Sequence, residues 1–287
     1  MGPVYTASCV AIQTKDSGYA LAGYTQSLEL DNDAWLVKTD AEGNMQWSRT
    51  YGATNYDRFN SVVESEDGGY AMTGMTHSSG DGSSWLVKTD AEGKMEWSKT
   101  YGTGDEGSSR LIKTSDKGYL MVGSRGLSGK GSFGWAVKTD AQGNTQWDLT
   151  YEERNGIFNS VVEAYDGGYV FGGRYWGDYG DDESAWLVKA SSSGNVKWQV
   201  DYTGDGTQVT SLIKTDDEGY AFTGTKDGTS SKSKIWFVKI APDSSPPETE
   251  PPPSTPPEPF PTTWIVAAVV TATVIGAGLL IYLKKLR

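Results

Sequence analysis

Residues 68–102, GGYAMTGMTHSSGDGSSWLVKTDAEGKMEWSKTYG, contain all three anchors of a pattern that runs through this 287-residue chain. A Gly-Tyr pair recurs at Gly18-Tyr19, Gly69-Tyr70, Gly118-Tyr119, Gly168-Tyr169 and Gly219-Tyr220. The segment W-x-V-K recurs at Trp35, Trp85, Trp135, Trp186 and Trp236, and a further Trp follows at Trp47, Trp97, Trp147 and Trp198. Every spacing is 49 to 51 residues. Such a fixed period indicates a protein built from repeated structural units.

Each copy predicts four short β-strands. In the second copy an apolar pair, Val62-Val63, gives the first strand, and a D-x-G-Y turn leads to the second strand at 70–74. A variable loop leads to the third strand at 85–89, and a D-x-x-G turn leads to the fourth at 95–101. The fourth segment alternates between apolar and polar residues, which is the period of a half-buried strand.

A four-stranded sheet cannot bury both of its faces alone, so the copies must pack face to face. Radial packing gives a β-propeller, and a linear solenoid, whose repeats are usually shorter, is the alternative. We therefore predict an all-β domain over residues 1–241, a five-bladed β-propeller of four-stranded antiparallel blades. The fifth copy ends before a fourth strand, so the last blade lacks one strand and nineteen strands are expected. Because Met1-Gly2 falls where the second copy has Tyr51-Gly52, we also expect a closing strand and an export signal upstream.

The turns and fourth strands resemble a known family. Asp40 to Trp47 and Asp90 to Trp97 match the D-x-x-G-x-x-x-W core of the tryptophan-docking motif in quinoprotein-like (PQQ-type) propellers, with the Asp-to-Gly gap one residue shorter. The complete pattern resembles repeat proteins of prokaryotic, often archaeal, cell surfaces that end in a Pro/Thr-rich stalk and a membrane helix. The resemblance implies a propeller at a cell surface, and it implies neither an activity nor bound PQQ.

The C-terminal part of the chain has a different composition. Residues 242–261 carry ten of the eleven prolines and predict an extended stalk or linker. Residues 264–283 carry no charge, and at about 1.5 Å per residue they span roughly 30 Å, so we predict a transmembrane α-helix over 262–283. The basic tail 284–287 then lies in the cytoplasm and the propeller lies outside the cell. A tail-anchored protein with a cytoplasmic propeller is the alternative.

Composition limits the partners and the chemistry. The net charge of −12 argues against a nucleic-acid partner. A single Cys and a single His exclude an intrachain disulfide and a four-ligand zinc site. No cofactor and no catalytic triad are expected, although the abundant carboxylates leave a two-carboxylate glycosidase open. Asp31-Asn32-Asp33 and Asp181-Asp182-Glu183 offer oxygen ligands for Ca²⁺ without matching an EF-hand, and solvated acidic loops are the alternative.

In an antiparallel meander, successive loops lie alternately at the two opposite ends of the strands, which become two faces of the domain. The D-x-G-Y and D-x-x-G turns are nearly identical among the copies, as tight turns require. The loops after the second and fourth strands differ, so we predict that their face binds a ligand. Aromatic rings beside carboxylates in the fourth copy suit a sugar. The predicted site residues are Tyr24, His77, Arg125, Arg174, Tyr175, Trp176 and Lys226.

The sequence favours a membrane-anchored binding or adhesion module whose partner is a glycan or an envelope protein. The alternatives are an extracellular propeller enzyme, either a glycoside hydrolase or quinoprotein-like, and a purely structural envelope protein. Two carboxylates roughly 5–9 Å apart in a pocket favour hydrolysis, and an aromatic-lined surface favours binding.

Overall fold

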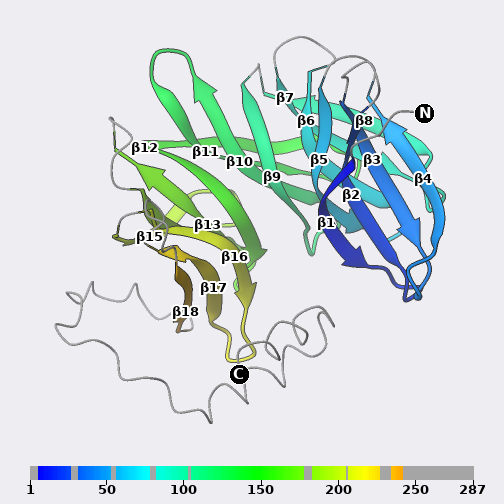
Figure 1. Cartoon of the computed structure of the whole chain (residues 1–287). Coiled ribbons are helices and arrows are strands. Elements are labelled where there is room, and N and C mark those ends of the chain that lie inside the picture. Colours follow the sequence, from blue (N-terminus) through cyan, green and yellow to red (C-terminus); the bar gives the residue numbers. More distant parts are fainter. Residues whose placement is uncertain are drawn as a thin grey trace. The chain divides into compact units, whose positions relative to one another are not determined.

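The computed structural model describes residues 6–26, 32–52, 56–77, 82–102, 105–177, 183–204, 206–226 and 234–241. These residues form eighteen β-strands and no helix, so the described part of the chain is all-β as predicted (Figure 1). The chain divides after Pro246, and every strand belongs to the N-terminal unit.

Each copy of the repeat forms one antiparallel meander. The first sheet contains β1 (Thr6–Gln13), β2 (Tyr19–Gln26), β3 (Asn32–Thr39) and β4 (Met45–Tyr51). The second sheet contains β5 (Asp57–Glu64), β6 (Tyr70–Thr76), β7 (Ser83–Thr89) and β8 (Met95–Tyr101). The strands therefore follow one another in space as they do in the sequence.

The third and fourth copies share a strand. The third sheet contains β9 (Glu106–Lys113), β10 (Tyr119–Leu127), β11 (Gly131–Thr139) and the first half of β12 (Thr145–Glu163). The fourth sheet contains the second half of β12, β13 (Tyr169–Trp176), β14 (Ser184–Ala190) and β15 (Val196–Tyr202). The fifth sheet contains β16 (Gln208–Lys214), β17 (Tyr220–Lys226) and β18 (Lys234–Ile240). Hydrogen bonding through β12 joins the third and fourth sheets into one seven-stranded sheet.

The described part of the chain has eighteen strands where nineteen were expected, because one substitution in the repeat merges two of them. Gly52 and Gly102 follow the fourth strands of copies one and two with φ of 121° and 92°, a backbone region that breaks a strand. Glu152 occupies the same place after Tyr151, and there the chain continues as β-strand. The fourth strand of copy three and the first strand of copy four are therefore the single strand β12.

The sheets pack in sequence order through two unlike faces. The back face of the first sheet carries the small side chains of Ala20, Ala22, Ala34 and Leu36, which pack on large side chains of the second sheet. That opposing front face carries Phe59, Tyr70, Met72, Trp85 and Val87. The next three junctions repeat this arrangement. Burial of these apolar faces explains why the copies stack.

The third anchor of the repeat crosses the first three junctions between sheets. Trp47 lies against Gly93 and Trp97 lies against Gly143, in the D-x-x-G turn of the following sheet. A Cβ on Gly143 would come within 2.8 Å of the Trp97 ring, so these turns require glycine. Beside Trp47, Trp97 and Trp147, a buried Tyr hydroxyl donates to the carbonyl of the turn glycine in the following sheet, as Tyr101 does to Gly143 at 2.8 Å. The repeated W-x-x-T-Y segment is thus an intersheet clasp.

The Lys of W-x-V-K also has a structural role. Lys38, Lys88, Lys138 and Lys189 are buried, each paired with the Asp of the D-x-G-Y turn. Hydrogen bonds from Lys38 Nζ and then from Thr14 lower the pKa of Asp16 to about 2. In each of these copies, the Lys on the third strand therefore ties that strand to the Asp in the turn before the second strand. The repeated Lys and Asp residues stabilise the sheet and do not form a ligand site.

The predicted C-terminal segments lie outside the described residues. These segments are the stalk at 242–261, the helix at 262–283 and the tail at 284–287. Among the described residues, no helix is long and apolar enough to cross a membrane.

Candidate functional site

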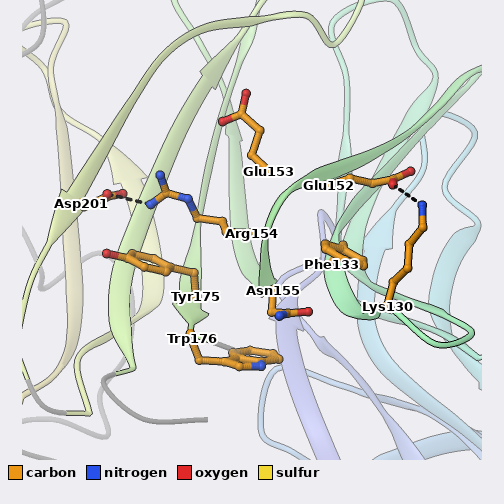
Figure 2. Close-up of a pocket in the computed structure, with 10 residues that line it drawn as sticks. Lys130, Phe133, Glu152, Glu153, Arg154, Asn155, Tyr175, Trp176 and Asp201 are labelled. Atoms are coloured by element: carbon orange, nitrogen blue, oxygen red, sulfur yellow. Dashed lines mark hydrogen bonds and ion pairs between the residues drawn. The ribbon is translucent and has the colours of Figure 1, made fainter. Parts of the chain in front are cut away.

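A pocket lies where the third and fourth copies meet, at the end of the sheets that carries the variable loops. Its volume is about 540 Å³. Its lining comes from the β10–β11 and β12 segments of the third copy and from β13 and β15 of the fourth (Figure 2). The lining residues are Lys130, Phe133, Glu152, Glu153, Arg154, Asn155, Tyr175, Trp176, Gly177 and Asp201.

The pocket arises from two departures from the repeat. Where copies two and three begin, Asp57 and Glu106 place buried carboxyl groups beside Gly52 and Gly102. Copy four has Gly156 at this register, opposite Tyr175, and so carries no side chain there. The glycine of the preceding turn is Glu152 instead. These two substitutions remove a buried acid, and they leave residues 152–155 as an extended strand that lies along the pocket.

Aromatic rings form one wall of the pocket. Tyr175 and Trp176 project from the end of β13, and both are half-buried. The Arg154 guanidinium lies 4.5 Å from the centre of the Tyr175 ring and 5.7 Å from that of Trp186, which fixes its position by cation–π attraction. Tyr175 packs edge-on against Trp186 with 6.5 Å between ring centres. The wall is therefore held from behind by the core of the fourth sheet.

The charged groups of the pocket are already paired. Lys130 Nζ lies 3.2 Å from Glu152 Oε2, and Arg154 Nη1 lies 2.7 Å from Asp201 Oδ2 (Figure 2). Gln199 Nε2 donates to Glu153 Oε2 at 2.8 Å. Each of the three carboxylates thus already has a polar or charged partner side chain.

Two buried acceptors in the pocket have unused capacity. Within the described residues, neither Asn155 Oδ1 nor Asp201 Oδ1 has a hydrogen-bond partner. Leaving such an atom unsatisfied costs about 1–3 kcal/mol, and because each atom is almost completely covered, a ligand recovers that energy once a small side-chain rotation turns the oxygen toward the pocket. Two such atoms in one pocket with aromatic rings indicate a ligand that carries several hydroxyl or amide donors.

The structure separates the predicted site residues into groups. It brings Arg174, Tyr175 and Trp176 together: Tyr175 and Trp176 line the pocket, and the Arg174 guanidinium lies 5.8 Å from the Trp176 ring centre. Arg174 also pairs with Glu183 at 2.8 Å.

The other predicted site residues lie at other sheets. Tyr24 and His77 flank the Tyr56 ring at the junction of the first two sheets, with ring centres 6.2 and 5.8 Å away. Arg125 is held in the third sheet by Glu106 at 3.0 Å and lies over a Trp ring. Lys226 ends β17 with an exposed side chain. The seven residues therefore do not form one site.

Sequence reasoning missed most of the pocket residues, among them Phe133, Arg154, Asn155 and Asp201. A signal was present, since E-E-R-N-G at 152–156 replaces the Gly-containing segment that follows the fourth strand in copies one and two. The position that breaks the repeat is the position that builds the pocket.

The described residues offer no cluster of three or more His, Cys, Asp or Glu side chains that could hold a metal. Glu183, from one proposed Ca²⁺ loop, is paired with Arg174. Asp31, Asp181 and Asp182 lie outside the described residues.

No protein-family model and no curated protein matches the sequence. The structure is similar to endo-arabinase from Bacteroides thetaiotaomicron, with 11% identity, 82% of this chain and 93% of that chain covered, and a TM-score of 0.48. It is similar to acylaminoacyl peptidase from Pyrococcus horikoshii, with 12% identity, coverage of 81% and 38%, and a TM-score of 0.47. It is also similar to Sqt1 from Chaetomium thermophilum, with 13% identity, coverage of 77% and 69%, and a TM-score of 0.44. At these scores the likeness assigns neither a family nor an activity.

Proposed function

We propose that this chain is a cell-surface binding module that takes a carbohydrate in the pocket between its third and fourth sheets. The observation that carries the proposal is the joint presence of the Tyr175 and Trp176 rings and the two unpartnered acceptors on Asn155 and Asp201. The five stacked copies act as the blades of a quinoprotein-like, five-bladed propeller, which supports the pocket on packed strands.

A sugar matches both features of the pocket. Its ring presents a flat array of C–H bonds that packs on an aromatic face, while its hydroxyl groups donate to buried acceptors. The pocket volume of about 540 Å³ lies in the range of small-ligand sites, about 300–1,000 Å³. Arg154 and Lys130 add donors for hydroxyl or carboxylate groups of the glycan.

Hydrolysis is supported less well than binding. A glycosidase needs one carboxylic acid that is protonated near neutral pH, which a nonpolar or acidic surrounding provides. Each pocket carboxylate instead has a donor: Lys130 for Glu152, Gln199 for Glu153 and Arg154 for Asp201. These contacts hold the carboxylates in place and suit groups that orient a ligand.

The location of the module follows from the C-terminal sequence. In the proposal, residues 242–261 are a stalk, residues 262–283 a single-pass membrane helix and residues 284–287 a cytoplasmic tail. The propeller then lies outside the cell, where envelope glycans are its partners. Protease treatment of intact cells tests this orientation: cleavage of the propeller without lysis supports it, and protection of the propeller contradicts it.

The test of the binding function is a glycan-array and envelope-polysaccharide screen with the purified full chain, followed by calorimetry on each binder. Trp176→Ala should weaken binding about 5- to 150-fold, the loss of an aromatic anchor worth about 1–3 kcal/mol. Tyr165→Ala is the matched control, because Tyr165 is 46% exposed and lies in the D-x-G-Y turn of the same copy. Equal affinities for the two variants would remove the site assignment.

The same binders also test hydrolysis. Incubation of each glycan with the chain, followed by reducing-end analysis, should give no cleavage. Cleavage that is lost in Glu152→Gln or Glu153→Gln would replace the binding function by the enzymatic one.

A further inference from the structure

The charged groups of the pocket between the third and fourth sheets do not cancel. Its lining carries carboxylates on Glu152, Glu153 and Asp201 and cations on Lys130 and Arg154. Three negative and two positive charges leave a net charge of −1. The whole chain has a net charge of −12, so its overall field has the same sign. A ligand that enters the pocket therefore meets a negative potential.

Glu153 is the carboxylate that no cation balances. Each of the two pocket cations already pairs with another carboxylate, one at 3.2 Å and the other at 2.7 Å. Glu153 Oε2 accepts instead from the neutral side-chain amide of Gln199, at 2.8 Å. Within the part of the chain that the structure describes, Glu153 has no ion pair. The excess negative charge of the pocket is therefore assigned to this residue.

An unused carboxylate oxygen lies in the same part of the pocket. Gln199, which holds Glu153, is two residues before Asp201 on β15, so both side chains lie on one face of that strand. Asp201 Oδ2 accepts from Arg154, the residue that follows Glu153 on β12. Asp201 Oδ1 has no hydrogen-bond partner among the described residues. One side of the pocket thus combines excess negative charge with an unused charged acceptor.

Both unsatisfied buried atoms of the lining are acceptors, Asp201 Oδ1 and Asn155 Oδ1. The strand register places Asn155 opposite Phe133 on β11 and opposite Trp176 on β13, so the amide lies between two aromatic side chains. A hydroxyl group has one hydrogen to donate, whereas an ammonium group has three and is positively charged. A hydrogen bond between ionised groups is also stronger than one between neutral groups. An amine therefore matches the acceptors and the charge of the pocket better than a hydroxyl group does.

We infer that the sugar bound in this pocket carries a free amino group, as a hexosamine unit of a glycan does. The inference rests on the proposed carbohydrate-binding function and names the class of sugar. The sugar ring packs on Tyr175 and Trp176. The protonated amine donates to Asp201 Oδ1 after a small rotation of that carboxyl group, and the unbalanced charge of Glu153 attracts it.

Two related sugars lack one of these features. A uronic acid brings a further negative charge, and Lys130 and Arg154 donate to its carboxylate only by weakening the ion pairs that they already make. An N-acetylated hexosamine keeps the sugar ring but has an uncharged amide with a single N–H. Comparison with the N-acetylated sugar therefore isolates the contribution of the amine.

Calorimetry on the purified full chain with three disaccharides tests the inference. The probes are a glucosamine disaccharide, its N-acetylated form and a galacturonic acid disaccharide, at about pH 6 and about 0.15 M salt, where amines are protonated and carboxylates ionised. The wild type should bind the glucosamine disaccharide about tenfold more tightly than the N-acetylated form, because the amine adds a charge-assisted hydrogen bond in a partly solvated pocket. The galacturonic acid disaccharide should bind most weakly.

Charge-removing variants locate the preference. Asp201→Asn should reduce the tenfold preference to about threefold or less, and Glu153→Gln, at an exposed residue, should reduce it in the same direction. Asp216→Asn is the matched control, because it removes the same charge from an exposed turn of the fifth copy at the opposite end of the sheets. This control should leave the preference at about tenfold.

Several outcomes would overturn the inference. Equal or tighter binding of the N-acetylated or galacturonic acid disaccharide, weakened by Trp176→Ala, would remove the amine preference and leave the carbohydrate function standing. A preference that survives both Asp201→Asn and Glu153→Gln, or that falls equally in Asp216→Asn, would assign it to the overall charge of the chain. Binding of none of the three disaccharides would also overturn the inference. The glycan array then decides the proposed function separately, since an array binder that Trp176→Ala weakens supports that function and an array without binders removes it.

Discussion

Replacing the lysine of W-x-V-K by methionine should destabilise the fold strongly in one copy of the motif and only slightly in another. In the third copy, Lys138 is only 2% exposed, and its Nζ lies 2.7 Å from Asp116 Oδ2 and 2.9 Å from the Thr139 carbonyl oxygen. In the fifth copy, Lys239 makes the equivalent ion pair with Asp217, but its side chain is 53% exposed. Lys138→Met and Lys239→Met therefore delete the same contact in a buried and in a solvated setting.

The expected magnitudes follow from burial. Lys138→Met leaves a buried carbonyl and a partly buried carboxylate without their charged donor, which costs about 2–4 kcal/mol of the free energy of unfolding. In the wild type, burial raises the pKa of Asp116, but hydrogen bonds from Lys138, Thr114 and the Gly118 N–H, together with the Lys138 charge, outweigh burial and hold that pKa below its usual range. Lys239→Met breaks a solvent-screened pair and should cost about 0–1 kcal/mol.

Urea unfolding followed by fluorescence measures both losses, since the chain has 11 Trp residues. At about 2–4 °C per kcal/mol for a domain of this size, the melting temperature of Lys138→Met should fall by roughly 4–16 °C. Equal destabilisation by the two variants, or a larger loss for Lys239→Met, would refute the view that these lysines act through burial.

Three further predictions concern the intersheet clasps and acid stability. Tyr151→Phe removes a buried hydroxyl that donates to a turn carbonyl, so its free energy of unfolding should fall by about 1–3 kcal/mol, against less than about 0.5 for the exposed Tyr19→Phe. Gly143→Ala meets the docked indole as well as a positive φ, so it should destabilise at least about 1 kcal/mol more than Gly43→Ala, which meets only the positive φ. Asp16 has a folded pKa of about 2, below the unfolded value of about 3.9, so its stabilising contribution is complete above about pH 4 and is lost as the pH falls toward 2, which acid unfolding monitors.

Periodicity was sufficient to predict the fold class and the four-strand repeat. The Gly-Tyr, W-x-V-K and Trp anchors recur at fixed spacing because each makes the same contact in every copy, so their positions identify the strands directly. The join between copies three and four was not predicted. It depends on whether the residue after the fourth strand can leave the strand, as Gly52 does and Glu152 does not.

The candidate site was only partly predictable, for a related reason. Tyr175 and Trp176 were conspicuous as aromatic residues in a variable loop, and they do line the pocket. Arg154 and Asp201 were not conspicuous, because charged residues on strands are ordinary and these two line a pocket only where copy four has Gly156 in place of the buried acid of copies two and three. The Lys and Asp anchors are conspicuous in the sequence but do not form a site. They recur because their ion pair stabilises the sheet in every copy.

A crystal structure of the chain with a glycan identified in the screen would show whether the pocket binds carbohydrate. We expect a sugar ring packed on Trp176 or Tyr175, with hydroxyl groups donating to Asn155 Oδ1 and Asp201 Oδ1. A glycan bound at the D-x-G-Y turns, at the opposite end of the sheets, or an unoccupied pocket in a chain that binds the glycan in solution, would contradict it.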